Sequence, residues 1–289
     1  MLTPADLAVL GAPGTGTALT FQGRERDGAL WAGVLRDEAG QRQWCVEDGL
    51  ARLYAPAEVT GSDVMMRRIY DGMPSLHDPG VKLGLPLYGG GTEDEIREGY
   101  MPWLDLAGLQ PRADGGPIRI LEVSVGTGAN LPLVLRDLPA GLPVELWGLD
   151  LSLGMMRQAK QKIARQAMRS PDGSHVRLMM ADAHHLPFQD HSFDRVFHVG
   201  GISAFRDPAR AMAEMARVAR PGTPIVVVDE ALDPERKNNA WHRLMFKMLT
   251  AWDSDVHVPR EHVPWSAEVL ADFQVSRFYY CLAFRLPVG

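Results

Sequence analysis

Residues 119–131 read Arg-Ile-Leu-Glu-Val-Ser-Val-Gly-Thr-Gly-Ala-Asn-Leu. The apolar start of this stretch predicts a buried β-strand, and the glycine-rich turn after it leads into a helix. Glycine has no Cβ and tolerates positive φ, so such a turn lets the backbone come close to a ligand. Because the first N–H groups of the helix point at the same place, the segment predicts a site for a nucleotide-like ligand.

Length, charge and cysteine content narrow the possible functions. The chain has 289 residues, of which 46% are hydrophobic, and a net charge of −6. These values suit one large α/β domain with an appendage. The acidic balance and the absence of a long Lys/Arg run disfavour nucleic-acid binding. There is no signal-peptide pattern and no apolar run of the roughly 20 residues that a membrane span requires, so we expect a cytoplasmic protein.

Three segments differ in pattern. Residues 1–60 contain short strand-like pieces between glycine turns and predict a small β-rich module. Residues 61–116 predict helices and loops that lead into the main domain and cover the active site. Residues 117–289 alternate strands with helices, which implies a Rossmann-like, doubly wound α/β fold with a mostly parallel sheet. Strands are expected at 118–123, 144–149, 176–180, 195–199 and 224–228, with a final strand or hairpin at 275–286, and helices at 130–138, 153–168, 208–219 and 240–251.

Polar side chains recur where the predicted strands end. Glu122 lies at the end of the first strand, Asp150 ends the second, Asp182 ends the third, and the fourth ends near His198. Ligands of an open α/β sheet bind beyond the carboxyl ends of its strands. Asp150 follows Gly126 by 24 residues and can accept hydrogen bonds from both hydroxyls of a ribose.

The turn fits a dinucleotide poorly. The dinucleotide fingerprint G-x-G-x-x-G/A needs a small last residue, and Leu131 stands there when the pattern is counted from Gly126. Counted one step earlier, Ser124 would replace the first glycine. Glu122 would also repel a pyrophosphate, whereas it suits a ligand with a positive charge, such as the α-ammonium of a methionine moiety.

Five segments together resemble the class I S-adenosylmethionine-dependent methyltransferases, most closely the subgroup typified by ubiquinone and menaquinone biosynthesis. The resemblance covers roughly residues 117–230 and implies a sheet of seven strands. Its segments are Glu-Val-Ser-Val-Gly-Thr-Gly (122–128), Leu-Asp-Leu-Ser-Leu-Gly-Met-Met (149–156), Ala-Asp-Ala-His-His-Leu-Pro-Phe (181–188), Ser-Phe-Asp-Arg-Val (192–196) and Ala-Arg-Pro-Gly (219–222).

The resemblance implies that the cofactor is S-adenosyl-L-methionine and that its product is S-adenosyl-L-homocysteine. Glu122 and the 124–128 backbone would hold the methionine part, Asp150 the ribose, and Asp182 the adenine. The residues implied to bind the cofactor are Glu122, Ser124, Gly126, Thr127, Gly128, Asn130, Asp150, Leu151, Met155, Asp182, Ala183 and His198. Ser124 departs from the family, which has glycine there, so it is the place to look first for backbone strain.

The first 60 residues show a weaker resemblance, to the zinc-ribbon-like module that begins some of these methyltransferases. Residues 12–15, Arg36 and Ala39 stand where the zinc-binding cysteines would be. Cys45 and Cys281 have no metal spacing, and we interpret His184, His185 and His191 as solvated loop residues. We therefore expect no metal.

The function that we expect is transfer of a methyl group to a small-molecule acceptor, apolar or aromatic in character. The alternatives are methylation of an rRNA or tRNA base, and a non-catalytic partner subunit that only binds the cofactor. Methyl transfer needs a general base only if the acceptor must lose a proton. The candidate bases are His198, then His242, Asp229 and Glu230. A homodimer is left open.

Overall fold

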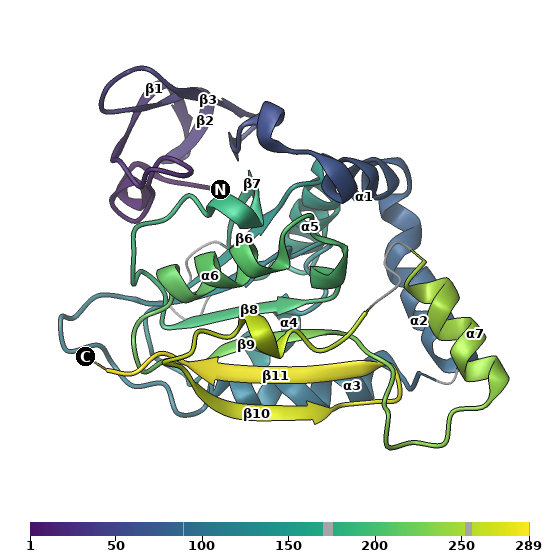
Figure 1. Ribbon diagram of the computed structural model, residues 1–289. Coiled ribbons are helices and arrows are strands. Elements are labelled where there is room, and N and C mark those ends of the chain that lie inside the picture. Colours follow the sequence, from purple (N-terminus) through teal and green to yellow (C-terminus); the bar gives the residue numbers. More distant parts are fainter. Residues whose placement is uncertain (89, 170–175, 252–255, 289) are drawn as a thin grey trace.

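The computed structural model of the chain describes residues 1–88, 90–169, 176–251 and 256–288, which are built around one sheet (Figure 1). The other residues fall within the predicted segments 61–116 and 117–289 and lie outside the described part. In that described part, eleven strands follow the order β1-β2-β3-β4-β7-β6-β5-β8-β9-β11-β10. The strands are β1 (Leu19–Arg26), β2 (Ala29–Asp37), β3 (Gln43–Glu47), β4 (Leu50–Leu53), β5 (Ile118–Val123), β6 (Val144–Asp150), β7 (Arg177–Ala181), β8 (Arg195–Val199), β9 (Ile225–Glu230), β10 (Glu268–Gln274) and β11 (Tyr279–Arg285).

The predicted seven-stranded sheet is extended to eleven strands. Seven strands, β5 to β11, come from the predicted segment 117–289. Five of these, β5 to β9, pair with one another in parallel. The β1–β4 meander is antiparallel, and its last strand pairs parallel to β7, with Ala51 opposite Met179. The N-terminal strands therefore continue the main sheet. No observation tests the zinc-ribbon resemblance, which stays a prediction.

Helices pack on both faces of the sheet, as the alternating pattern predicted. The α-helices are α1 (Gly61–Gly72), α2 (His77–Tyr88), α3 (Glu93–Tyr100), α4 (Leu131–Asp137), α5 (Leu153–Arg165), α6 (Pro208–Val218) and α7 (Ala240–Leu249). The shorter 3-10 helices are η1 (Pro4–Ala8), η2 (Pro56–Glu58), η3 (Pro74–Leu76), η4 (Met101–Leu104), η5 (Ala183–His185), η6 (Ile202–Ala204) and η7 (Arg260–His262). Side-chain caps begin α5 and α6: Ser152 Oγ accepts from Met155 N, and Asp207 Oδ1 accepts from Arg210 N.

Two apolar cores lie on opposite faces of the sheet. Side chains alternate along β5, so Leu121 and Val123 join the core under α6, whereas Ile118 and Ile120 join the core under α4 and α5. In the first core, Trp147 meets the rings of Phe188 and Phe193 edge-on at 5.7 and 6.0 Å.

The strand order reverses between β5 and β8. From β5 the chain proceeds outward through β6 and β7, and it then returns to β8 and β9 on the other side of β5. The loops that follow β5 and β8 therefore diverge at this point and leave a crevice at the carboxyl ends of the strands. The ligand site predicted from the glycine turn lies there.

Candidate active site

The glycine turn after β5 is held in a left-handed backbone conformation. Ser124 has φ +57°, Gly126 +53° and Gly128 +74°. A Cβ on Gly126 would meet nothing within 4 Å, whereas a Cβ on Gly128 would lie 3.0 Å from Leu131 Cδ1 and 3.6 Å from Ala159 Cβ. Gly126 is thus open toward the crevice, and Gly128 lets α4 and α5 approach the turn. The expected strain at Ser124 is confirmed as a positive φ at a residue with a side chain.

A cavity of about 240 Å³ opens beside this turn. Eight of the twelve residues predicted for the cofactor line it: Glu122, Ser124, Gly126, Thr127, Asn130, Asp150, Leu151 and Met155. The other four, Gly128, Asp182, Ala183 and His198, are outside its lining. Of the four candidate bases, Glu230 lines the cavity, and His198, His242 and Asp229 do not.

Glu122 is buried at the inner end of the cavity and only half of its carboxyl group is satisfied. Asn130 Nδ2 donates to Oε1 at 2.7 Å, while Oε2 has no hydrogen-bond partner among the described residues. Asn130 is itself oriented by Tyr100, whose hydroxyl donates to Asn130 Oδ1 at 2.9 Å, and by Arg97 Nε at 3.2 Å. Burial raises the pKa of Glu122 from 4.5 to about 8, against the lowering effect of the Asn130 hydrogen bond. An ammonium group of a ligand would supply the missing donor and the compensating charge.

Asp150 is fixed by two backbone amides. Gly126 N donates to Oδ2 at 3.0 Å, and Ser152 N donates to Oδ1 at 2.8 Å. Burial raises the pKa of Asp150 from 3.8 to about 6, and the two backbone hydrogen bonds oppose that shift. Each carboxylate oxygen has a second acceptor position, so Asp150 can still accept from the hydroxyl groups of a ribose.

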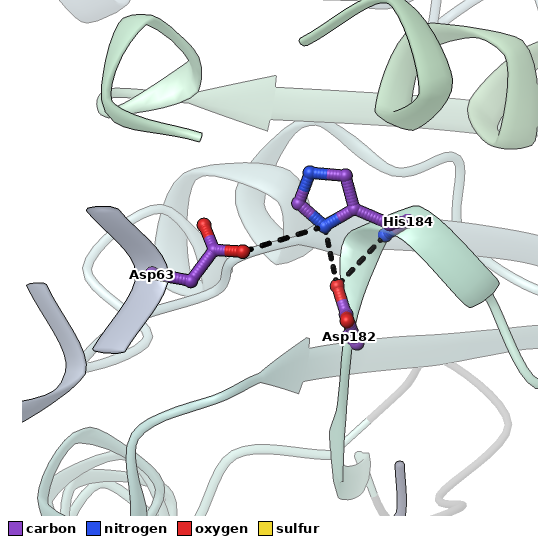
Figure 2. A group of neighbouring side chains, drawn as sticks. All are labelled: Asp63, Asp182 and His184. Atoms are coloured by element: carbon purple, nitrogen blue, oxygen red, sulfur yellow. Dashed lines mark hydrogen bonds and ion pairs between the residues drawn. The ribbon is translucent and has the colours of Figure 1, made fainter. Parts of the chain in front are cut away.

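Asp182 takes part in a buried ion cluster instead of the cavity wall. Its Oδ1 accepts from His184 N at 2.9 Å and from His184 Nδ1 at 2.5 Å, and its Oδ2 accepts from Arg206 Nη2 at 2.8 Å. Figure 2 shows Asp63, from α1, beside the same ring nitrogen of His184, with its Oδ2 3.8 Å from Nδ1. Arg206 also binds Asp63 and so joins the two carboxylates. Although burial alone would raise it, the pKa of Asp182 is held below its usual range by the hydrogen bonds from His184 and Arg206.

This cluster corrects the interpretation of His184 as a solvated loop residue, because the side chain is buried with 2% of its surface exposed. The ligand atoms of Asp63, Asp182 and His184 lie within 4.8 Å of one another, which is compact enough for a metal ion. However, the Arg206 guanidinium already contacts both carboxylates and balances their charge.

The two candidate histidines occupy different environments. His198 is fully buried, its Nδ1 donates to the carbonyl of Val123 at 3.0 Å, and burial lowers its pKa, so the ring is neutral. His242 lies in the first turn of α7, where its Nδ1 accepts a 3.4 Å hydrogen bond from the backbone N–H of Asn239. His198 supports the strand that leads into the glycine turn, and His242 caps a helix.

Glu230 combines burial with a place on the cavity wall. The hydroxyl of Tyr279 donates to Oε1 at 3.1 Å, and Oε2 has no partner in the part of the chain that the structure describes. Burial, followed by the charge of Asp229, raises the pKa of Glu230 well above its usual range. Asp229 also accepts from Gly201 N at 2.7 Å and Ser203 N at 2.8 Å, which shapes the loop after β8.

Helices α1 to α3 close the cavity with residues for which the sequence had no motif. Tyr70 from α1 and Asp78 from α2 line it, and Asp78 ties α2 to the glycine turn through Thr127 Oγ1 at 2.7 Å and to α5 through Lys162 Nζ at 2.6 Å. Arg97 and Tyr100 from α3 complete the wall beside Asn130. Side chains such as Asp78 and Arg97 are common on any helix surface, so only the tertiary structure reveals their role.

Comparison with known proteins agrees with this geometry. A family model described as "Methyltransferase domain" matches residues 121–227. The phosphatidylethanolamine N-methyltransferase of Cereibacter sphaeroides is 32% identical over 166 residues, which cover 57% of this chain and 76% of that protein. The demethylmenaquinone methyltransferase of Porphyromonas gingivalis is 34% identical over 113 residues, which cover 39% of this chain and 44%, less than half, of that protein.

A solved structure shows the same fold. Phosphoethanolamine N-methyltransferase 2 of Haemonchus contortus, in complex with S-adenosyl-L-methionine, superposes with a TM-score of 0.53 at 13% identity, over 81% of this chain and 62% of that one. The parallel sheet, the glycine turn and the acidic residues at the strand ends define a nucleotide-binding α/β protein. With the relatives above, the chain belongs to the class I S-adenosylmethionine-dependent methyltransferases, and it is a methyltransferase enzyme that uses this cofactor.

Proposed function

We propose that the enzyme transfers the methyl group of S-adenosylmethionine to a small-molecule acceptor bound in this cavity. One observation carries the proposal. Glu122 and Glu230 line the same cavity, and each keeps a buried Oε2 without a partner among the described residues. A buried carboxylate oxygen without a donor costs free energy unless a ligand satisfies it. Glu122 suits the cofactor ammonium, which leaves Glu230 for the acceptor.

The cofactor site in this proposal consists of the eight lining residues predicted from the sequence. Glu122 and Asn130 bind the methionine end, and Asp150 binds the ribose. The other four predicted residues support the cavity wall without lining it: Gly128, Asp182, Ala183 and His198. His198 donates to the Val123 carbonyl, and Asp182 accepts from Arg206. Residues 117–289 thus hold the cofactor, residues 61–116 cover it, and residues 1–60 extend the sheet.

The bound cofactor supplies a methyl group on a positively charged sulfur, which is already activated for displacement. The protein then has to align the acceptor with that methyl group, and α1 to α3 restrict its orientation. Glu230 is the base that we favour, because its raised pKa strengthens it as a proton acceptor once it is ionised. Tyr279 donates to Oε1, which leaves Oε2 as the oxygen without a partner among the described residues. His198 and His242 stay candidates with weaker support, since neither lines the cavity.

Apolar side chains favour a lipid-like or aromatic acceptor. Met66, Ala204 and Phe205 line the cavity beside Tyr70 and Glu230. The two relatives named above are a phosphatidylethanolamine and a demethylmenaquinone methyltransferase. Acceptors of these chemical classes combine an apolar body with a polar reacting group, which matches the composition of the wall.

Labelled methyl transfer to a panel of phospholipids and quinones tests the proposal. We expect Glu230→Gln to keep the contact with Tyr279 but lower the turnover rate ~100-fold, the lower end for loss of a general base. Calorimetry should show cofactor affinity within about twofold of the wild type. The matched control is Glu235→Gln, an exposed carboxyl outside the cavity. Unchanged turnover in Glu230→Gln would remove Glu230 from the reaction.

A further inference from the structure

Helices α1, α2 and α7 lie along one end of the molecule (Figure 1). Helix α2 contacts η3 and α7. The inner faces of α1 and α2 line the cavity through Met66, Tyr70 and Val81. Helix α7 rests on the body through Phe246, whose ring centroid is 5.5 Å from that of Phe278. The inner faces of these helices are therefore already occupied by packing and by the cavity.

Their outer faces are apolar as well. On α1 and directly after it, Met65, Ile69 and Met73 recur every four residues and are 44, 44 and 55% exposed. This spacing places them on one side of the helix. They are not needed for the core, because α1 is held by Asp63 and by the inner side chains named above.

The neighbouring elements continue this apolar surface. Leu76 of η3 and Leu83 and Leu87 of α2 are 61, 69 and 64% exposed. On α7, the exposed residues are Trp241, Leu244 and Met248, whose spacing again defines a single face. Exposed apolar side chains gathered on neighbouring elements in this way mark an interaction site.

The charges on the same helices are sorted by sign. Four basic side chains, those of Arg68, Lys82, Arg243 and Lys247, are exposed and have no hydrogen bond or ion pair within the part of the chain that the structure describes. The acidic residues of α1 and α2 face the body, where Asp63 binds Arg206, Asp71 binds Ser152 and Asp78 binds Thr127. Helix α7 contains no acidic residue. In a chain of net charge −6, the unpaired charged side chains on α1, α2 and α7 are therefore basic.

We propose that the outer faces of α1, η3, α2 and α7 form a docking face for the surface of an anionic lipid bilayer. Leucine, methionine and tryptophan side chains enter the boundary between head groups and acyl chains, while Lys and Arg meet the anionic head groups. None of the helices in the described residues is both long and apolar enough to cross a bilayer, so the contact is peripheral. The inner faces of α1 and α2 line the cavity, so docking brings membrane lipids next to it.

Charge and composition favour a bilayer over other partners. A second copy of the chain in a two-fold contact would bring the four basic residues of each copy together, where like charges repel. A nucleic acid would match the basic residues but leave the apolar stripe in water. The docking face does not depend on the proposed function, because vesicle binding can be measured without any methyl acceptor.

Sedimentation of the full chain with phosphatidylcholine vesicles, with and without phosphatidylglycerol, tests this proposal. We expect binding to the anionic vesicles, and weaker binding as salt is raised. Trp241→Ser/Leu244→Ser/Met248→Ser and Arg243→Glu/Lys247→Glu should each lower the partition coefficient at least tenfold. Their melting temperatures should stay unchanged, because all five side chains are on the surface. The control is Trp265→Ser, a residue 97% exposed and outside these helices, which should bind as the wild type does.

Three results would overturn the proposal. The first is a loss of the expected difference in vesicle binding. Either the wild type sediments equally with both kinds of vesicle, or the triple variant sediments with anionic vesicles as well as the wild type does. The second is binding to an RNA oligonucleotide that Arg243→Glu/Lys247→Glu abolishes while the triple variant retains it. The third is a wild-type dimer, in the absence of vesicles, that the triple variant converts to a monomer.

Discussion

The side-chain amide of Asn130 donates a 2.7 Å hydrogen bond to Oε1 of Glu122, eight residues earlier in the chain. This contact joins the end of β5 to the start of α4 across the glycine turn. It fixes one oxygen of the carboxyl group and leaves the other buried without a partner among the described residues, at a residue that lines the cavity. The pair therefore leaves one buried carboxyl oxygen of Glu122 without a hydrogen-bond donor, which a bound ammonium group would supply.

Glu122→Gln should stabilise the free protein and weaken cofactor binding. Burial raises the pKa of Glu122 from 4.5 to about 8, so the folded chain binds this proton more tightly than the unfolded chain. The resulting stability is complete below pH 4.5 and is lost as pH rises to about 8. Glutamine removes this dependence and still accepts from Asn130. Thermal unfolding between pH 5 and 9 should show a smaller decline for the variant, and calorimetry a lower S-adenosylmethionine affinity. If the thermal stability of the wild type and of the variant declined equally with pH, Glu122 would not be the group that titrates.

Ser124→Gly should stabilise the fold by about 1 kcal/mol, because φ +57° is costly for a residue with a Cβ. Gly126→Ala is the matched opposite change. Gly126 has φ +53° and a Cβ there would meet nothing within 4 Å. We therefore expect Gly126→Ala to lower the free energy of unfolding by about 1 kcal/mol through backbone strain alone. Urea unfolding of both variants measures the two effects. A destabilised Ser124→Gly would show that the serine hydroxyl contributes more than the strain costs.

Local patterns predicted the parts of the fold that depend on neighbours in the sequence. The strand expected at 118–123 is confirmed as β5, since an apolar run followed by a glycine turn has few alternatives. Strand β10 was not predicted. It lies at the edge of the sheet, pairs with β11 only and buries little of its surface, so its alternation is weak.

Some side-chain pairings of the site join segments far apart in the sequence, and the motifs did not predict them. The Asp182 motif was found in the sequence, but Arg206, which occupies its carboxylate, comes from a loop 24 residues later. Arg97 and Tyr100 reach Asn130 from a helix about 30 residues earlier. No pattern within either segment signals such pairings, because they exist only once the loop before α6 lies near the end of β7 and α3 lies near the start of α4.

Asp150→Ala should weaken S-adenosylmethionine binding at least tenfold, or ~1.4 kcal/mol, since the variant loses the acceptor for the ribose hydroxyls. The pKa of about 6 adds a second signature. The wild-type affinity should fall as pH decreases through 6, because the protonated carboxyl accepts fewer hydrogen bonds. Calorimetry at pH 5 and pH 7.5 measures both effects. Asp137→Ala, at the end of α4 and outside the cavity, should bind normally, and an equal loss there would point to general destabilisation.

Arg206→Ala should destabilise the protein by about 3–5 kcal/mol, because it leaves two buried carboxylates without their shared cation. The side chains of Asp63 and Asp182 are only 6 and 4% exposed. In the variant Asp182 loses the Arg206 hydrogen bond that lowers its pKa, so its pKa rises in the folded state, and stability is retained at low pH and lost as pH increases. The deficit relative to the wild type should therefore be larger at pH 7.5 than at pH 5. The control is Arg26→Ala, which removes an ion pair with both side chains more than half exposed and should change stability by about 0.5 kcal/mol or less. A deficit independent of pH would mean that Arg206 acts by packing, and that the cluster joining α1 to the end of β7 is not held by charge.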